Sequence, residues 1–236
     1  MNSTLLQAID NYCERTGPEL WSEPLNALTN LAFIAAGIWG LILVRGNRTG
    51  SFAALLAWMA VLIGLGSGLF HTWANGLTKW GDIIPIALFV FTFTLFVLRR
   101  FLGFGWAVSV VLFVAFYAAA GFLTYLVPPW LVVATNGSSG YLPAFLAMLV
   151  FGLWVSARGH PAGKYMLAGA GIFVASVTFR IIDPNVCESM PIGTHFLWHT
   201  LNGLLLGVLL TAAALHGHAQ AQAPNSFGRG SFRQPA

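Results

Sequence analysis

Long apolar stretches separated by short polar breaks run through most of the chain. An uncharged run fills every position between Arg100 and Arg158, which is longer than one membrane crossing of about 20 residues. Charges, proline pairs and clusters of Gly, Ser and Asn divide the chain into apolar segments. We expect seven of them, at residues 25–44, 51–73, 82–98, 104–124, 141–157, 164–182 and 194–215. The pattern predicts an all-α integral membrane protein, built as a seven-helix transmembrane bundle.

Composition agrees with this prediction and excludes other classes. Of the 236 residues, 57% are hydrophobic and 8% charged, and the mean hydropathy is +0.76. The 11 Lys and Arg are too few and too scattered for a nucleic-acid-binding surface. The first residues lack a basic start followed by an apolar stretch, so we expect no cleaved signal peptide. We assign residues 1–219 to the membrane domain and expect 220–236, rich in Gln, Ala, Gly, Pro and Ser, to form a disordered cytosolic tail.

The distribution of basic residues predicts how the bundle is oriented. Eight Lys and Arg fall in the first, third and fifth connections or near the C-terminus, whereas only Arg15, Lys79 and Arg180 fall on the other side. Because Lys and Arg in short loops stay in the cytosol, we expect the N-terminus outside and the C-terminus inside. All seven acidic residues also fall on the outer side. The short loops favour a bacterial inner membrane, or an endomembrane if the protein is eukaryotic.

The two cysteines both fall on the predicted outer side. Cys13 precedes the first apolar segment, and Cys187 lies between the sixth and the seventh. Disulfides persist outside the cytosol, so we predict a Cys13–Cys187 bridge that ties the N-terminal segment to the last outer loop. The alternative is that two free thiols share a side by chance.

Three of the six histidines lie at the outer ends of predicted helices. His71 closes the second apolar segment, and His195 and His199 open the seventh. A spacing of four places His195 and His199 on one helical face, where both imidazoles can bind one metal ion. Three neutral imidazoles leave the fourth tetrahedral position of zinc open for water, as in catalytic zinc sites. We therefore predict a zinc ion bound by these three histidines.

Other polar residues are expected at the same depth. Ser67 precedes His71 by one helical turn, and Asp82 begins the third apolar segment. Since three histidines do not neutralise Zn²⁺, a nearby carboxylate is favoured and can accept a proton from water. Asn202 continues the face of His195 and His199, so we expect it to support a metal ligand. A stripe of small residues should let neighbouring helices approach, formed by Ala60, Gly64, Ser67 and Gly68.

Each of these positions also has a purely structural interpretation. Asp82 could be the N-cap of a helix with Pro85 in its first turn, and Ser67 could be a small packing residue. We assign His160, His216 and His218 to helix caps or lipid headgroups. The functional interpretation is favoured by the set as a whole, because its five members map to one end of three helices.

At these residues the sequence resembles the alkaline ceramidase family of seven-helix membrane hydrolases. The resemblance implies zinc on His71, His195 and His199, catalytic roles for Ser67 and Asp82, and cleavage of the amide bond of ceramide or a similar N-acyl lipid within the surrounding membrane lipids. It rests on Asn11-Tyr12-Cys13-Glu14, Glu23-Pro-Leu-Asn26-Ala-Leu-Thr29-Asn30, Gly66-Ser67-Gly-Leu-Phe70-His71 with Asp82, Phe179-Arg-Ile-Ile-Asp183 before Cys187, and His195-x-x-Trp198-His199.

The resemblance also implies a calcium ion on the N-terminal segment. Carried over by position, its ligands would be Asn11, Tyr12 through its carbonyl, Glu14, Thr16 and Glu23. The sequence departs from the family here, with Asn at position 11 where the family usually has an acid, and with a shortened stretch from Cys13 to Glu23. The alternative is an acidic segment that is simply solvated.

Two other functions are compatible with parts of the pattern. Adiponectin-receptor-like and hemolysin III-like proteins share the same Ser, Asp and His arrangement, and could use such a metal site in signalling. That class is expected to keep its N-terminus in the cytosol, opposite to the orientation predicted here. A transporter or a haem electron carrier could also use paired histidines, but the sequence has no Cys-x-x-Cys-His haem motif.

Overall fold

A computed structural model describes residues 3–218 of the chain. Within this range seven helices are long and apolar enough to cross a membrane, and the only pairing of β type is one isolated bridge between Ala8 and Asn75. The predicted all-α, seven-helix fold is therefore confirmed. The expected tail at 220–236 lies outside the described residues.

The helices follow the predicted order with some changes at their ends. The first span combines α1 (Pro24–Thr29) and α2 (Leu31–Asn47), and α4 continues into a π-helical turn, η2 (Val97–Phe101). Short elements are η1 (Ser3–Leu6), α6 (Pro129–Ala134) and η3 (Ser138–Tyr141). The remaining spans are α3 (Ser51–Thr72), α4 (Gly76–Phe96), α5 (Trp106–Tyr125), α7 (Leu142–Ala157), α8 (Ala162–Val186) and α9 (His195–His216).

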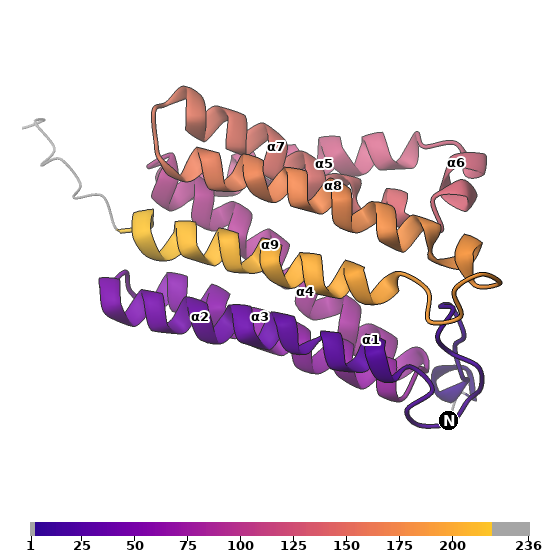
Figure 1. The fold of residues 1–236 in the computed structure, drawn as a ribbon. Coiled ribbons are helices and arrows are strands. Elements are labelled where there is room, and N and C mark those ends of the chain that lie inside the picture. Colours follow the sequence, from indigo (N-terminus) through magenta and orange to yellow (C-terminus); the bar gives the residue numbers. More distant parts are fainter. Residues whose placement is uncertain (1–2, 219–236) are drawn as a thin grey trace, which may run out of the picture.

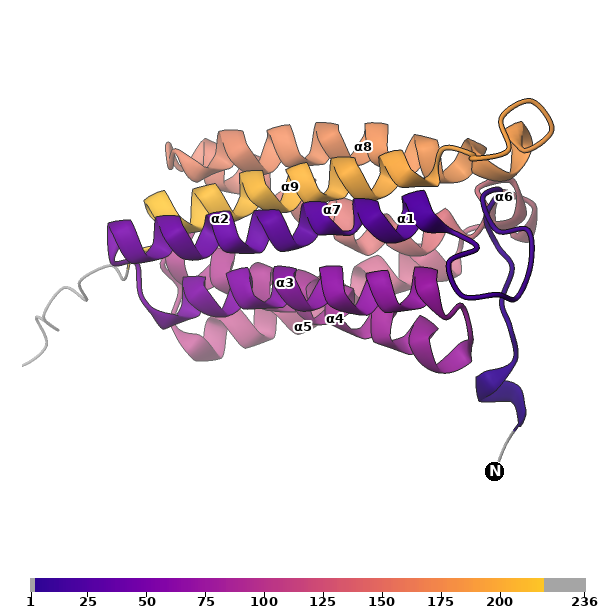
Figure 2. The ribbon, with the colours of Figure 1, turned by 60° about the horizontal axis from the view of Figure 1, so that its bottom comes forward.

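Helix α9 occupies the centre of the bundle. In Figures 1 and 2 it lies between α2 and α8, and these two helices are its main neighbours. It is also the most buried of the seven spans. Polar side chains on α9 therefore face other helices instead of lipid, which is where such side chains are tolerated in membrane proteins.

A disulfide joins the N-terminal segment to the end of α8, as predicted. Cys13 and Cys187 are bonded, with their Cα atoms 5.0 Å apart. Beside the bond, the buried Asp183 carboxylate accepts hydrogen bonds from the backbone N–H groups of Cys13, Thr194 and His195, at 3.2, 2.6 and 2.9 Å. Asp183 thus caps the first turn of α9 from α8, and it fixes the position of His195. We call this end of the molecule the disulfide end.

Helix α4 begins earlier than the sequence pattern indicated. Its N-cap is Asn75, whose side chain accepts hydrogen bonds from the N–H groups of Leu77 and Thr78, both at 3.0 Å. The Thr78 hydroxyl in turn accepts from the Asn75 N–H, which completes a capping box. The predicted start at residue 82 and the N-cap interpretation of Asp82 are therefore wrong. Asp82 lies inside the helix, where its side chain can face the bundle.

A close backbone contact joins α3 and α4 next to Asp82. Pro85 has no N–H, so it leaves the carbonyl of Gly81 without its helical partner. Gly66 packs against that carbonyl, and a Cβ at Gly66 would overlap the Gly81 oxygen. The predicted stripe of small residues lies on a different face of α3 from Gly66. Its member Gly64 packs against Asn30 and Ile34 of the first span. Gly66 and Gly81, which meet in this contact, directly precede Ser67 and Asp82 in the sequence.

Arg180 is turned toward the interior of the bundle. Helix α8 extends past it to Val186, and its guanidinium donates to the Asn136 carbonyl at 2.8 Å and to the Ser138 hydroxyl at 2.6 Å. It also lies over the rings of Tyr141 and Trp198. These partners explain how a charge is accommodated within the span.

Replacing Gly66 by Ala should destabilise the protein, because the added methyl meets backbone that cannot move aside easily. Overpacking of this kind costs about 1–3 kcal/mol. Gly68→Ala is the matched control, since its Cβ would meet nothing closer than Asn30 Cβ at 3.8 Å. Thermal unfolding in detergent should give a lower Tm for Gly66→Ala only. Equal Tm values for the two variants would contradict the proposed close contact.

Candidate metal site and active site

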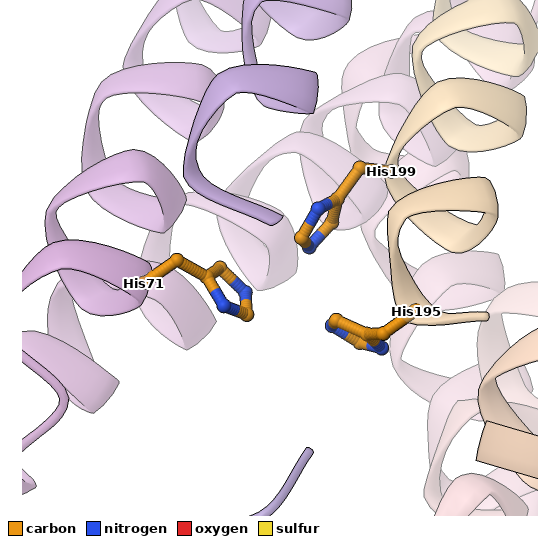
Figure 3. Close-up of side chains that lie close together, drawn as sticks. All are labelled: His71, His195 and His199. Carbon is orange, nitrogen blue, oxygen red and sulfur yellow. The ribbon is translucent and has the colours of Figure 1, made fainter. Parts of the chain in front are cut away.

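Three buried histidines converge at the disulfide end of the bundle. Figure 3 shows His71 on α3 facing His195 and His199 on α9, with the three rings pointing toward one another. One nitrogen from each ring lies within 4.8 Å of the others, and each residue is only 1% exposed. In the part of the chain that the structure describes, this is the only group of three or more His, Cys, Asp or Glu suited to a metal ion.

Two oxygen acceptors orient two of these rings. The Nδ1 atom of His71 lies 2.6 Å from Glu23 Oε2, and Nδ1 of His199 lies 3.1 Å from the Thr29 hydroxyl. The Thr29 hydroxyl donates its own hydrogen to the Leu25 carbonyl, so it accepts from His199. With Nδ1 protonated, Nε2 of each neutral ring carries the free lone pair. Among the described residues, no hydrogen bond engages Nε2 of any of the three rings.

His195 is held differently. Its Nδ1 atom is buried and has no hydrogen-bond partner within residues 3–218. The ring of Tyr12 stacks on it, with 3.7 Å between the ring centroids. Burial raises the pKa of the Tyr12 phenol above its usual value, so this residue stays neutral at physiological pH. The N-terminal segment therefore covers the histidines with an uncharged aromatic ring.

The donor set fits a zinc ion. Three imidazoles whose Nε2 atoms make no hydrogen bond within the described residues match the ligands of catalytic zinc sites, which keep a fourth position open. The contacts from Glu23 and Thr29 are the outer partners that metal-binding histidines commonly have. Burial by itself would raise the pKa of the Glu23 carboxyl, but hydrogen bonds from His71 and Arg15 outweigh it and hold the pKa below its usual value. Glu23 therefore contributes a negative charge beside the site.

Ser67 and Asp82 lie in the same cavity as two of the histidines. The cavity wall includes Ser67, Asp82, His195 and His199. Asp82 Oδ1 is buried with no hydrogen-bond partner among the described residues. A carboxylate oxygen with no protein partner is available to accept a proton from water. The structure thus brings together all five residues that the sequence placed at one end of three helices.

From these polar groups the cavity continues between the helices as an apolar channel. Its deeper wall is formed by side chains from α4, α7, α8 and α9, among them Phe93, Phe151, Met166 and Leu209. Polar chemistry at one end and an apolar wall at the other suit a ligand with a polar linkage and a long hydrocarbon chain.

Comparison with protein families bears on the functions considered above. The sequence matches the Ceramidase family over residues 7–228, which is nearly the whole chain. The chain belongs to the Ceramidase family. Membership implies an amidohydrolase with a lipid substrate. It therefore favours a hydrolase over a signalling receptor or a haem carrier. No curated protein matches the sequence.

The residues expected to hold calcium in this Ceramidase family member do not fit that ion. Both oxygens of Glu23 are occupied, one by Arg15 and the other by His71 and Asn26. The two oxygens of Glu14 accept the N–H groups of Leu25 and Asn26, at 2.6 and 2.8 Å, at the start of α1.

The other expected calcium ligands are no better placed. The Tyr12 carbonyl accepts the Arg15 N–H, and Asn11 and Thr16 are exposed. We derive no step through calcium.

Sequence reasoning assigned one supporting residue incorrectly and missed two. Asn202 donates to the Ser176 hydroxyl at 2.7 Å and to the Trp198 carbonyl at 2.9 Å, and it makes no hydrogen bond to the three histidines within the described range. Its amide therefore joins α9 to Ser176 of α8. The partners of His71 and His199 are Glu23 and Thr29. Polar residues at 23, 26, 29 and 30, bordering an apolar span, are the signal that could have revealed them.

Glu23→Gln should weaken zinc binding about 10- to 100-fold, because loss of an outer partner of a metal ligand has effects of this size. Thr29→Ala should cause a smaller loss, since a neutral acceptor is removed. Glu19→Gln, an exposed acid of the same segment, is the control. Competition with a chromophoric chelator measures the affinities. If Glu23→Gln and Glu19→Gln bind zinc equally well, Glu23 does not support His71.

Proposed function

We propose that this protein is a zinc-dependent intramembrane hydrolase that cleaves the amide bond of ceramide or a similar N-acyl lipid. The products are a sphingoid base, or another amine, and a fatty acid. The observation that carries the proposal is the buried three-histidine group, with Ser67 and Asp82 beside it, at the polar end of an apolar cavity. Membership of the Ceramidase family supports the same chemistry.

The zinc ligands in this proposal are Nε2 atoms of His71, His195 and His199. When bound, the ion acts as a Lewis acid and lowers the pKa of water toward about 7. Glu23 and Thr29 keep two of the ligand rings in the tautomer that presents Nε2. Tyr12 and the disulfide-bonded segment cover the site and limit the entry of bulk water.

Asp82 is the general base and then the general acid. Its unpartnered oxygen accepts a proton from the attacking water as the water oxygen bonds to the amide carbon. The same proton then passes to the amide nitrogen as the carbon–nitrogen bond breaks, so the carboxylate is regenerated. Proton transfer by a positioned side chain typically contributes about 10²- to 10⁴-fold in rate.

Ser67 stabilises the charge that develops on the carbonyl oxygen. Ser67 lines the cavity one turn before His71 on α3. In the transition state it donates to the oxyanion, and one such donor is worth about 10²- to 10³-fold in kcat. The lipid chain occupies the apolar part of the cavity while this chemistry takes place.

We also propose that the disulfide end faces the periplasm or lumen. The charge distribution supports this orientation, and a disulfide at this end is consistent with an oxidising compartment. An N-acyl lipid would then enter from the outer leaflet. A reporter that works only outside the cytosol should be active when it is fused to the N-terminus. Activity of a reporter that works only in the cytosol, fused to the same end, would reverse the assignment.

Variants separate metal binding from catalysis. His195→Ala should lose both zinc and hydrolysis, because only two of the three ligands remain to hold the ion. Asp82→Asn should retain about one zinc per chain and lose about 10²- to 10⁴-fold in turnover. His160→Ala, which changes a histidine bonded to the Ala162 N–H in the loop before α8, should leave both unchanged.

The measurement combines metal analysis of each purified variant with mass spectrometry of products from a panel of N-acyl lipids. Full hydrolysis by metal-free protein would refute the proposed function. Turnover by Asp82→Asn at the rate of the unmodified protein would remove Asp82 from the mechanism.

A further inference from the structure

Arg15 is a buried cation at the disulfide end of the molecule. Its side chain is 2% exposed, although it precedes the first membrane span and lies in a segment with exposed neighbours. A buried charge is costly unless it is paired and hydrogen-bonded, so its surroundings should show what it balances.

Every hydrogen bond of the Arg15 guanidinium goes to oxygen. Nε donates to Glu23 Oε1 at 2.5 Å, Nη1 donates to the Gly17 carbonyl at 3.0 Å, and Nη2 donates to the His71 carbonyl at 3.3 Å. The Glu19 carbonyl lies at the edge of hydrogen-bonding distance, 3.5 Å from Nη1. One carboxylate and several carbonyls are the kind of oxygen set that also suits a hard cation such as calcium.

The guanidinium acts on His71 from two sides. It holds Glu23, whose other oxygen accepts from His71 Nδ1, and it also binds the backbone carbonyl of His71. The positive charge of Arg15 balances the negative charge of the Glu23 carboxylate, which would otherwise be buried without a cation beside it. Hydrogen bonds from Arg15 to Glu23 and from His71 to Glu23 therefore connect the N-terminal segment to one proposed metal ligand.

We propose that Arg15 is the built-in cation of this segment and that it replaces calcium there. It is a positioning residue, which acts through Glu23 to hold His71 in place. Zinc binding and the stability of the protein are then independent of calcium. The inference uses the proposed function only for the identity of the metal on the histidines.

The first test is a calcium titration of the unmodified protein. Zinc affinity, by chelator competition, and Tm should be the same with calcium as with a calcium-selective chelator. A Tm or a zinc affinity that rises with calcium would overturn the inference. If the protein bound no zinc, the proposed function would fail, whereas the Tm titration would still decide whether calcium binds.

The second test replaces the cation. Arg15→Gln should weaken zinc binding about 10- to 100-fold, the effect expected for an outer partner, and Arg15→Lys should recover part of the loss because it restores the charge. Lys79→Gln is the matched control, since it removes an exposed positive charge near the same end. Should Arg15→Gln fail to fold, Arg15→Lys and the calcium titration carry the test.

Chemical rescue distinguishes a cation site from a structural role. In Arg15→Gly, millimolar guanidinium should strengthen zinc binding, and the same addition should leave Lys79→Gln unchanged. Zinc binding by Arg15→Gln equal to that of Lys79→Gln, or Arg15→Gly that does not respond to guanidinium, would contradict the inference.

Discussion

Three imidazoles buried in an apolar bundle must each find partners for two ring nitrogens. An unpaired polar group in such surroundings costs about 1–3 kcal/mol, so the arrangement persists only if most of these nitrogens are satisfied. Glu23 and Thr29 satisfy Nδ1 of His71 and His199. One nitrogen of each of the three rings faces a common space, which a single metal ion can fill. The rest of the site follows from this requirement.

The helices and the N-terminal segment contribute different parts of the solution. Helices α3, α4 and α9 carry the three proposed metal ligands and the two side chains proposed to react, Ser67 and Asp82. The segment before the first span supplies Tyr12, Arg15 and Glu23, which cover the site, balance its charge and set a ring tautomer. Asp183 and the disulfide fasten that segment to the start of α9.

Features that depend on local periodicity were predictable from sequence. The apolar segments, the His195 and His199 pair at a spacing of four, and the cysteines on one side all follow from the order of residues along the chain. Contacts between distant backbone segments were not. The start of α4 depends on a local capping box of Asn75 and Thr78, which lies before the apolar segment from which the helix was predicted and was therefore overlooked. The α3–α4 approach depended on Gly66 meeting a carbonyl that Pro85 releases, which no single-segment pattern reveals.

X-ray absorption at the zinc edge of the purified protein tests the central claim most directly. The account predicts a four-coordinate ion with only nitrogen or oxygen neighbours at about 2.0–2.1 Å, and imidazole scattering that weakens in His199→Ala. A sulfur neighbour at about 2.3 Å, or a spectrum that does not change when His199 is replaced, would contradict it.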